Sequence, residues 1–162
     1  MLAMLDGFAA FSVERDGVRL HARSAGEGPP LLLMHGHPQS MAMWHRVAPT
    51  LARHFTLVLM DLRGYGASTL GFRQSNVDDY CDDILRVMQH FGAKKLVLVG
   101  LSYGSWIATS FAMRHPEMLA GLVLSGGCTG MSEAGPEERE AFRVSREVPL
   151  NAGQVPADFA PA

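Results

Sequence analysis

The chain contains four short apolar runs, and longer segments with apolar residues at helical spacing separate them. Strands covered on both faces read as continuous apolar runs, whereas a helix with one buried face repeats about every 3.6 residues. The runs therefore predict central strands of a sheet. Their ranges are 31–36, 56–64, 94–100 and 119–127.

The clearest helix is predicted at 75–92. Asn76 is a good N-cap, Asp79 follows three residues later, and Gly92 supplies a C-cap glycine. Acidic residues crowd the first turn, where they complement the helix dipole. Two further helices are expected, at 44–55 with Pro49 in its middle and at 105–115.

Two more strands are expected near the N-terminus, at 8–15 and 18–24, because Asp16–Gly17 between them favours a tight hairpin turn. Strands that alternate with helices predict an α/β fold with a mostly parallel sheet of about six strands and helices on both faces. Near Cys128 the pattern changes to polar residues and prolines. We therefore expect a core at 1–127 and a separate segment at 128–162.

Composition narrows the classes of function. The chain has 162 residues, of which 48% are hydrophobic and 19% charged, and its formal net charge is -2. This balance gives no reason to expect nucleic acid or an anionic membrane as a partner, and the apolar runs are too short to span a bilayer. Cys81 and Cys128 make neither a disulfide framework nor a metal site, which favours a reducing, cytoplasmic location. No motif requires a metal, nucleotide or organic cofactor.

The pentapeptide Gly100–Leu101–Ser102–Tyr103–Gly104 lies where a buried strand is expected to end and a helix to begin. A G-x-S-x-G sequence in this context is typical of a nucleophile elbow, whose tight turn lifts the serine clear of the backbone. The N-terminus of a helix also favours developing negative charge. Ser102 as a simple helix cap is the alternative, and the context favours the nucleophile.

Two further motifs follow the neighbouring predicted strands. In His35–Gly36–His37–Pro38, the backbone N–H of His37 can point at the same spot as the N–H of Tyr103, and two such donors form an oxyanion hole. A plain turn is the alternative. The segment Asp61–Gly66 is interpreted as structural, with Asp61 and Arg63 holding loops through hydrogen bonds and an ion pair.

The three motifs, in this order and at these strand ends, resemble the α/β-hydrolase superfamily over Phe8 to about Gly127. They are most similar to its small serine-dependent members: esterases, enol-lactonases of the 3-oxoadipate type and cofactor-free haloperoxidases. The resemblance implies that Ser102 is the nucleophile and that the amides of His37 and Tyr103 form the oxyanion hole. Haloalkane dehalogenases and epoxide hydrolases resemble the chain around "HGHP" but carry aspartate at the nucleophile position. The segment 128–162 resembles the beginning of the family's lid.

The chain departs from the family pattern in its acid and base. The family places an acid and then a histidine after the nucleophile, whereas the last histidine here is His115, at an expected helix end. His35 and His37 are the histidines expected nearest to Ser102, and neither stands at the family's base position. Glu133 is an acid at an alternative position. The chain thus resembles the N-terminal half of an enzyme, and losing a triad member costs about 10⁴ to 10⁶ in turnover.

Three functions are consistent with these motifs. The first is a serine hydrolase of small esters or lactones that works through an acyl-enzyme and is weak or inactive in this chain. The second is a truncated, non-catalytic hydrolase that binds a small ligand or a partner, and the third is a perhydrolase or haloperoxidase. The apolar strand at 119–127 is expected at a sheet edge, so we also expect self-association through it.

Overall fold

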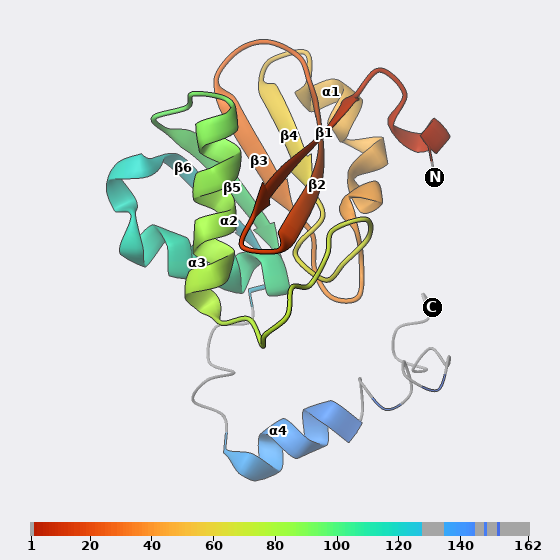
Figure 1. Cartoon of the computed structure of the whole chain (residues 1–162), viewed down its shortest axis with the longest axis vertical. Helices are drawn as coiled ribbons and strands as arrows, with labels where there is room; N and C mark the ends of the chain where they lie inside the picture. The colour runs from red at the N-terminus through yellow and green to blue at the C-terminus, as the bar shows by residue number, and fades with distance from the viewer. Residues whose placement is uncertain (1, 128–134, 145–147, 149–151, 153–162) are drawn as a thin grey trace. The chain divides into compact units, whose positions relative to one another are not determined.

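A computed structural model of the chain describes residues 2–127, 135–144, 148 and 152 (Figure 1). The chain divides into two compact units, Met1–Cys128 and Thr129–Ala162, and each is considered by itself. In the second unit, the described helix α4 spans Pro136–Phe142. The role of this unit as a lid stays a prediction.

The first unit is built on a six-stranded sheet of order β1-β2-β4-β3-β5-β6. The pairs β4–β3, β3–β5 and β5–β6 are parallel, whereas β1–β2 and β2–β4 are antiparallel. The predicted mostly parallel α/β sheet of about six strands is confirmed. The strands are β1 (Ala9–Arg15), β2 (Val18–Ala25), β3 (Pro30–Met34), β4 (Thr56–Met60), β5 (Leu96–Leu101) and β6 (Leu119–Ser125).

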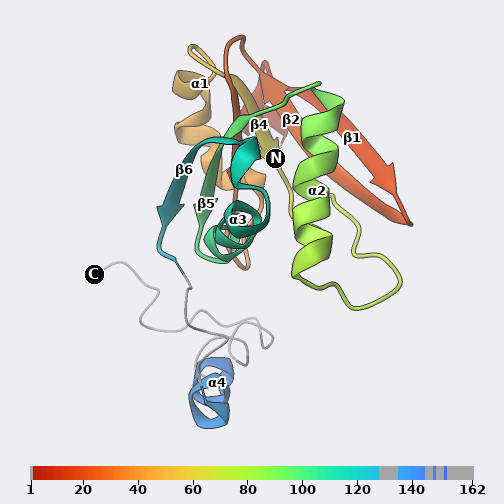
Figure 2. The ribbon, with the colours of Figure 1, turned by 90° about the vertical axis from the view of Figure 1, so that its left-hand side faces the viewer.

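Helices cover both faces of this sheet (Figure 2). The long helices α2 and α3 pack on one face, and the short elements η1, η2 and α1 pack on the other. The bounds are η1 (Leu2–Leu5), η2 (Met41–Arg46), α1 (Ala48–Leu51), α2 (Val77–His90), α3 (Tyr103–Arg114) and η3 (Pro116–Met118).

The central strands alternate between two apolar layers. In β3, Leu32 and Met34 face α2 and α3, while Leu31 and Leu33 face η2 and α1. All four side chains are buried. Successive residues of a strand point to opposite faces, so a strand with a layer on each side needs apolar residues throughout. The uninterrupted apolar runs of the sequence arise in this way.

Two local predictions are confirmed. The side chain of Asn76 accepts a hydrogen bond from the Asp79 amide at 3.1 Å, and Asp79 Oδ2 accepts one from the Asn76 amide at 2.8 Å. This capping box begins α2, and Gly92, with φ 60°, follows its end. At the β1–β2 turn, Asp16 and Gly17 both have positive φ, as a tight hairpin turn requires.

The single helix predicted over 44–55 is wrong. The structure has a 3-10 helix at Met41–Arg46 and then a separate four-residue helix at Ala48–Leu51. Pro49 lies in the first turn of the second helix, where its missing N–H has no intrahelical acceptor to lose. Proline therefore starts a new helix here and does not continue the preceding one.

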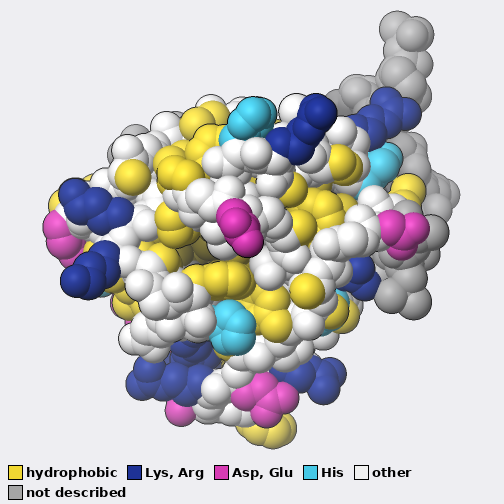
Figure 3. All heavy atoms as spheres, turned by 90° about the horizontal axis from the view of Figure 1, so that it is seen from above, with side chains coloured by type: hydrophobic (Ala, Val, Ile, Leu, Met, Phe, Trp, Pro, Cys, Tyr) yellow, Lys and Arg dark blue, Asp and Glu magenta, His cyan; other side chains and the backbone are white. Residues whose placement is uncertain are grey.

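Charges of both signs are mixed with apolar side chains on the face seen from above in Figure 3. Basic, acidic and histidine side chains alternate there around exposed hydrophobic ones. A continuous basic patch, which a nucleic-acid partner would favour, is not visible on this face.

Strand β6 stands at one end of the sheet and pairs only with β5 among the described residues. Three successive side chains in it are partly open to solvent: Leu122 is 39% exposed, Val123 51% and Leu124 44%. No residue of Leu119–Ser125 is charged. An apolar edge strand without charges is a template for pairing with another strand.

We predict that a polypeptide of these 162 residues self-associates through β6. Val123→Lys places a charge on the open edge and is expected to shift the sedimentation profile towards monomer at a given concentration. Met113→Lys on α3, where the side chain is 79% exposed, is the control and should leave association unchanged. A wild-type chain that sediments as a monomer at every concentration would contradict the prediction.

Candidate active site

Ser102 lies between the end of β5 and the start of α3, at the carboxyl edge of the parallel strands (Figure 1). Its backbone has φ 51° and ψ −112°, a conformation that L-residues with side chains rarely adopt. Such a residue costs about 1–3 kcal/mol and persists only where the surroundings fix it. The strand, the sharp turn and the helix are the features of a nucleophile elbow.

Close packing of backbone against backbone fixes this turn. A Cβ at Gly100 would lie 2.3 Å from the carbonyl oxygen of Gly104. A Cβ at Gly104 would lie 2.6 Å from the His35 carbonyl oxygen and 2.7 Å from that of Met34. Both positions of the pentapeptide therefore require glycine, as the sequence indicates. The missing side chain at Gly104 lets the start of α3 approach the end of β3 this closely.

The two predicted oxyanion donors lie on either side of the serine. Tyr103 is the first residue of α3, so its N–H has no acceptor within the helix. On the other side, a Cβ at Gly36 would lie 3.0 Å from Ser102 Cβ, which places His37, the next residue, at the same corner. The structure thus brings Ser102, His37 and Tyr103 together, while their catalytic roles stay predictions.

The Ser102 backbone is anchored on two sides. Its N–H donates to the carbonyl oxygen of Ser125, the last residue of β6, at 2.8 Å. Its carbonyl oxygen accepts from the Ser105 amide at 2.9 Å and from the Ser105 hydroxyl at 2.8 Å. These bonds fix the elbow to the edge strand and to the first turn of α3.

His35 has a structural role. Its side chain is buried, Nε2 accepts from the Leu62 amide at 3.0 Å, and Nδ1 lies 2.8 Å from the Gly36 carbonyl oxygen. Because an amide can only donate, Nε2 must be the acceptor and Nδ1 must carry the proton. Burial lowers the pKa of His35 and keeps the ring neutral, even though Gly36 and Asp61 act in the opposite direction. Both ring nitrogens are occupied, so His35 is not a base for Ser102.

His37 is exposed, and its Nδ1 lies 2.8 Å from the Tyr65 hydroxyl. The Tyr65 ring is edge-on to both histidines, with its centroid 5.3 Å from that of His35 and 5.8 Å from that of His37. Burial raises the pKa of Tyr65, so the phenol stays protonated. This contact could not be expected from the sequence, because nothing in the spacing of Tyr65 and His37 indicates that their side chains meet.

A cluster of aromatic side chains extends from this corner along α3. The Tyr103 and Trp106 rings stack with centroids 5.4 Å apart, and Tyr80 is edge-on to Tyr103 at 5.8 Å. Burial and then the neighbouring Tyr80 hydroxyl raise the pKa of Tyr103. The phenol of Tyr103 therefore stays neutral and packed, which leaves the backbone N–H as the part of Tyr103 suited to chemistry.

Asp61 joins two loops, as expected from the sequence. Its buried carboxylate accepts from the Met41 amide at 2.8 Å through Oδ1 and from the Ala67 amide at 2.9 Å through Oδ2. A Cβ at Gly66 would lie 2.1 Å from Oδ2, so glycine is required there. Both carboxylate oxygens accept hydrogen bonds from backbone amides, so Asp61 has a structural role.

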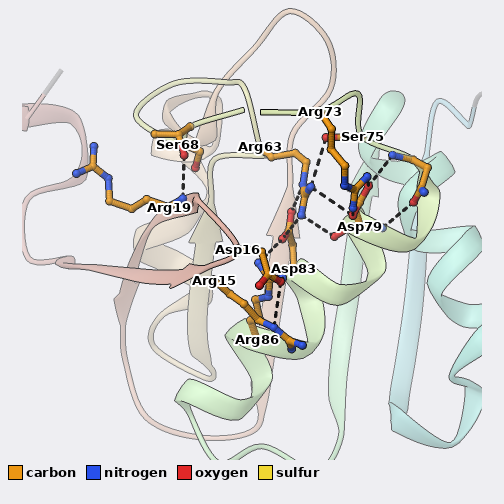
Figure 4. A network of polar contacts seen from close by, with 12 residues as sticks. Arg15, Asp16, Arg19, Arg63, Ser68, Arg73, Ser75, Asp79, Asp83 and Arg86 are labelled. Carbon is orange, nitrogen blue, oxygen red and sulfur yellow. Dashed lines mark hydrogen bonds and ion pairs between the residues drawn. The ribbon is translucent and has the colours of Figure 1, made fainter. Parts of the chain in front are cut away.

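Arg63 ties the loop after β4 to α2 (Figure 4). Its Nε donates to Asp83 Oδ2 at 2.7 Å and its Nη2 to Asp83 Oδ1 at 2.6 Å, a bidentate pair between two buried side chains. Nη2 also donates to the Asp79 carbonyl oxygen at 3.0 Å. Burial alone would lower the pKa of Arg63, but its hydrogen bonds with Asp83 and the Asp83 charge outweigh burial and raise it. The ion pair expected for Arg63 exists, and its partner is on α2.

From the sequence we expect neither metal ligands nor membrane spans, and the described part of the chain shows the following. No group of three or more His, Cys, Asp or Glu side chains is placed there to hold a metal ion. Burial raises the pKa of Cys81 to about 11, so this thiol is protonated and unreactive at neutral pH. Among these residues, no helix is long and apolar enough to cross a membrane. Cys128 and Glu133 lie outside the described residues.

Comparison with known proteins places the chain in a family. A sequence model of the alpha/beta hydrolase fold matches residues 29–162, so the chain belongs to the alpha/beta hydrolase fold family. It is 35% identical over 126 residues to a fluoroacetate dehalogenase from Burkholderia sp.. It is 33% identical over 120 residues to a soluble epoxide hydrolase from Corynebacterium sp. strain C12. The two matches cover 75% and 74% of this chain but only 41% and 42% of those relatives.

A solved structure extends the likeness to an acyl substrate. The structure of Est816, described as an N-acyl homoserine lactone degrading enzyme, superimposes with a TM-score of 0.78 at 26% identity. The match covers 88% of this chain and 55% of Est816. Relatives of the chain therefore include proteins named for three different substrates: fluoroacetate, epoxides and an N-acyl homoserine lactone.

We predict that Gly104→Ala destabilises the core, although alanine is intrinsically about 1 kcal/mol better than glycine within a helix. The added Cβ would meet the carbonyl oxygens of His35 and Met34, and overpacking of this kind costs about 1–3 kcal/mol. Gly121→Ala is the control, since its Cβ would make only ordinary contacts with Val97 at 3.5 Å. Urea unfolding of both variants measures the difference, and equal stability would contradict the packing argument.

We also predict that Arg63→Met costs about 3–5 kcal/mol of folding free energy, because buried Asp83 would lose its bidentate partner and keep only Arg86, whose Nη1 lies 3.5 Å from Oδ1. Arg73→Met is the matched control: Arg73 also pairs with an aspartate of α2, Asp79, but its side chain is 67% exposed. Removing an exposed pair costs about 1 kcal/mol or less. The free energies of unfolding in urea test this, and a similar loss in both variants would contradict it.

Proposed function

We propose that the chain carries the nucleophile and oxyanion hole of a serine-dependent hydrolase of small esters or lactones. The observation that carries the proposal is the backbone of Ser102, held at positive φ between a buried strand and a helix N-terminus. Residues with strained backbone concentrate at functional sites, and a serine that only caps a helix needs no such conformation.

The proposed reaction has two steps. Ser102 Oγ attacks the carbonyl carbon, and the oxygen of that carbonyl accepts hydrogen bonds from the N–H groups of His37 and Tyr103. A general base takes the serine proton and passes it to the departing alcohol, which leaves an acyl-enzyme. Water then attacks the acyl carbon and releases a carboxylate together with free Ser102.

The serine favours an acyl substrate over the epoxides and halides named for the dehalogenase and hydrolase relatives. A serine oxygen that displaces halide or opens an epoxide forms an ether, which water does not hydrolyse at a useful rate. A carboxylate nucleophile forms an ester in the same step, and an ester can be hydrolysed. Water can regenerate the free serine only if the covalent intermediate is an ester. The substrate must therefore supply the acyl group of that ester.

The base is the incomplete part of the proposal. No histidine follows His115 in the sequence, and both ring nitrogens of His35 are engaged in the fold. An elbow and oxyanion hole without a histidine retain about 10³ to 10⁴ over the uncatalysed rate. We therefore propose that these 162 residues by themselves form at most a slow enzyme. We also propose that it acts in the cytoplasm, because Cys81 and Cys128 do not make a disulfide framework.

A non-catalytic role is the second candidate, and the engagement of both ring nitrogens of His35 in the fold favours it. On this alternative, the same corner binds a small ligand without turnover. A perhydrolase would use the same serine with peroxide in place of water as the attacking group. The two catalytic candidates share the acyl-enzyme, whereas the binding role does not require a reactive Ser102.

Covalent labelling with a fluorophosphonate probe, with intact mass as the readout, separates these functions. A reactive elbow is expected to gain one probe per chain, and Ser102→Ala should abolish the gain. Ser110→Ala, on the same helix, is the control that should label like the wild type. A folded wild-type chain that takes up no probe in hours would contradict a catalytic role and favour the binding role.

A further inference from the structure

A cavity lies between the β1–β2 hairpin, the short helices η1 and η2, and the loop after β4. Its volume is about 270 Å³, and Ser102 is not among its lining residues. Small side chains on three sides leave the space open. They are Ala10 of β1, Ser40 and Ala42 at η2, and Ala67 in the loop after β4.

Two basic side chains of β2 line this cavity from the same face of the strand. His21 and Arg23 are two positions apart, and side chains at that spacing share a face. Arg23 Nη1 donates only to neutral acceptors, the carbonyl oxygens of Leu5 at 3.3 Å and Phe8 at 3.4 Å. Within residues 2–127, no carboxylate lies within ion-pair distance of Arg23, and the His21 ring has no hydrogen-bond partner. A half-buried arginine at the wall of the cavity therefore has no ion-pair partner within residues 2–127.

The other lining residues of the cavity indicate which further chemical groups a ligand would need. Leu5 and Met41, 4% and 6% exposed, supply apolar surface. Asp61 lines the side towards the β4 loop, where both of its oxygens already accept backbone amides. Its negative charge disfavours an anionic group on that side and favours one beside Arg23. A water molecule occupies about 30 Å³ in the liquid, so the cavity has room for roughly nine atoms of that size.

We propose that this cavity is a binding site for a small aliphatic monocarboxylate, with its carboxylate at Arg23 and His21 and its chain against Leu5 and Met41. The site is separate from the proposed catalytic corner, and it does not depend on Ser102 being reactive. Guanidinium–carboxylate hydrogen bonds are among the strongest available to a protein, and a partly buried site screens them less than open water does.

Ligand-observed NMR titration of the full chain tests the proposal, with hexanoate as the probe. Hexanoate should bind saturably, and 1-hexanol and hexylamine should bind at least about tenfold more weakly, because neither carries the negative charge that Arg23 would bind. Equal binding of hexanol would overturn the carboxylate assignment. Absence of saturable hexanoate binding would overturn the site.

Variants locate the binding. Ala10→Leu fills the cavity and should abolish hexanoate binding, while Ala9→Leu, on the opposite face of β1, should not. Arg23→Gln should weaken binding about tenfold and Arg23→Lys should restore part of it, because lysine keeps the charge. Ser102→Ala should bind like the wild type. Loss of binding in Ser102→Ala, or full binding in Ala10→Leu, would place hexanoate elsewhere and overturn the proposal, whatever the outcome of fluorophosphonate labelling.

Discussion

The close approach of α3 to the ends of β3 and β5 is the constraint on which the site depends. Gly104 lies against the carbonyl oxygens of Met34 and His35, and Gly100 lies against Gly104 itself. With no Cβ between them, strand and helix are joined by a single strained residue, Ser102. The position of the serine is therefore set mainly by backbone packing, to which the hydrogen bond from the Ser105 hydroxyl adds.

Buried polar groups hold the other loops around this corner. His35 and Asp61 bind backbone amides of neighbouring loops, and Arg63 binds Asp83 on α2. All four side chains are buried, and a buried polar group is costly unless it is hydrogen-bonded. Histidine, aspartate and arginine are common in catalytic sites, but each of these side chains is already engaged in hydrogen bonds that hold the fold. The proposed chemistry therefore uses Ser102 and backbone N–H groups, and none of these four side chains.

Much of this architecture could be predicted because its signals are local. Apolar runs, the Asn76–Asp79 capping box and the Asp16–Gly17 turn each arise within a few residues, and the strand-to-helix context identifies the elbow. Pairs that form only after folding left no such signal. The contact of His37 with Tyr65 spans 28 residues, and Arg63 meets Asp83 across 20. The division of the helix over 44–55 was also missed, because apolar spacing outweighed the local effect of Pro49.

The hydrogen bond from the Ser102 amide to the Ser125 carbonyl oxygen joins the reactive corner to the last residue of β6. That strand forms the open end of the sheet in the described part of the chain, where fraying is easiest. Pairing or fraying of this edge strand would change the hydrogen bond that holds the Ser102 backbone. In the proposed function, the reactivity of Ser102 therefore depends on the state of β6, through this one backbone hydrogen bond.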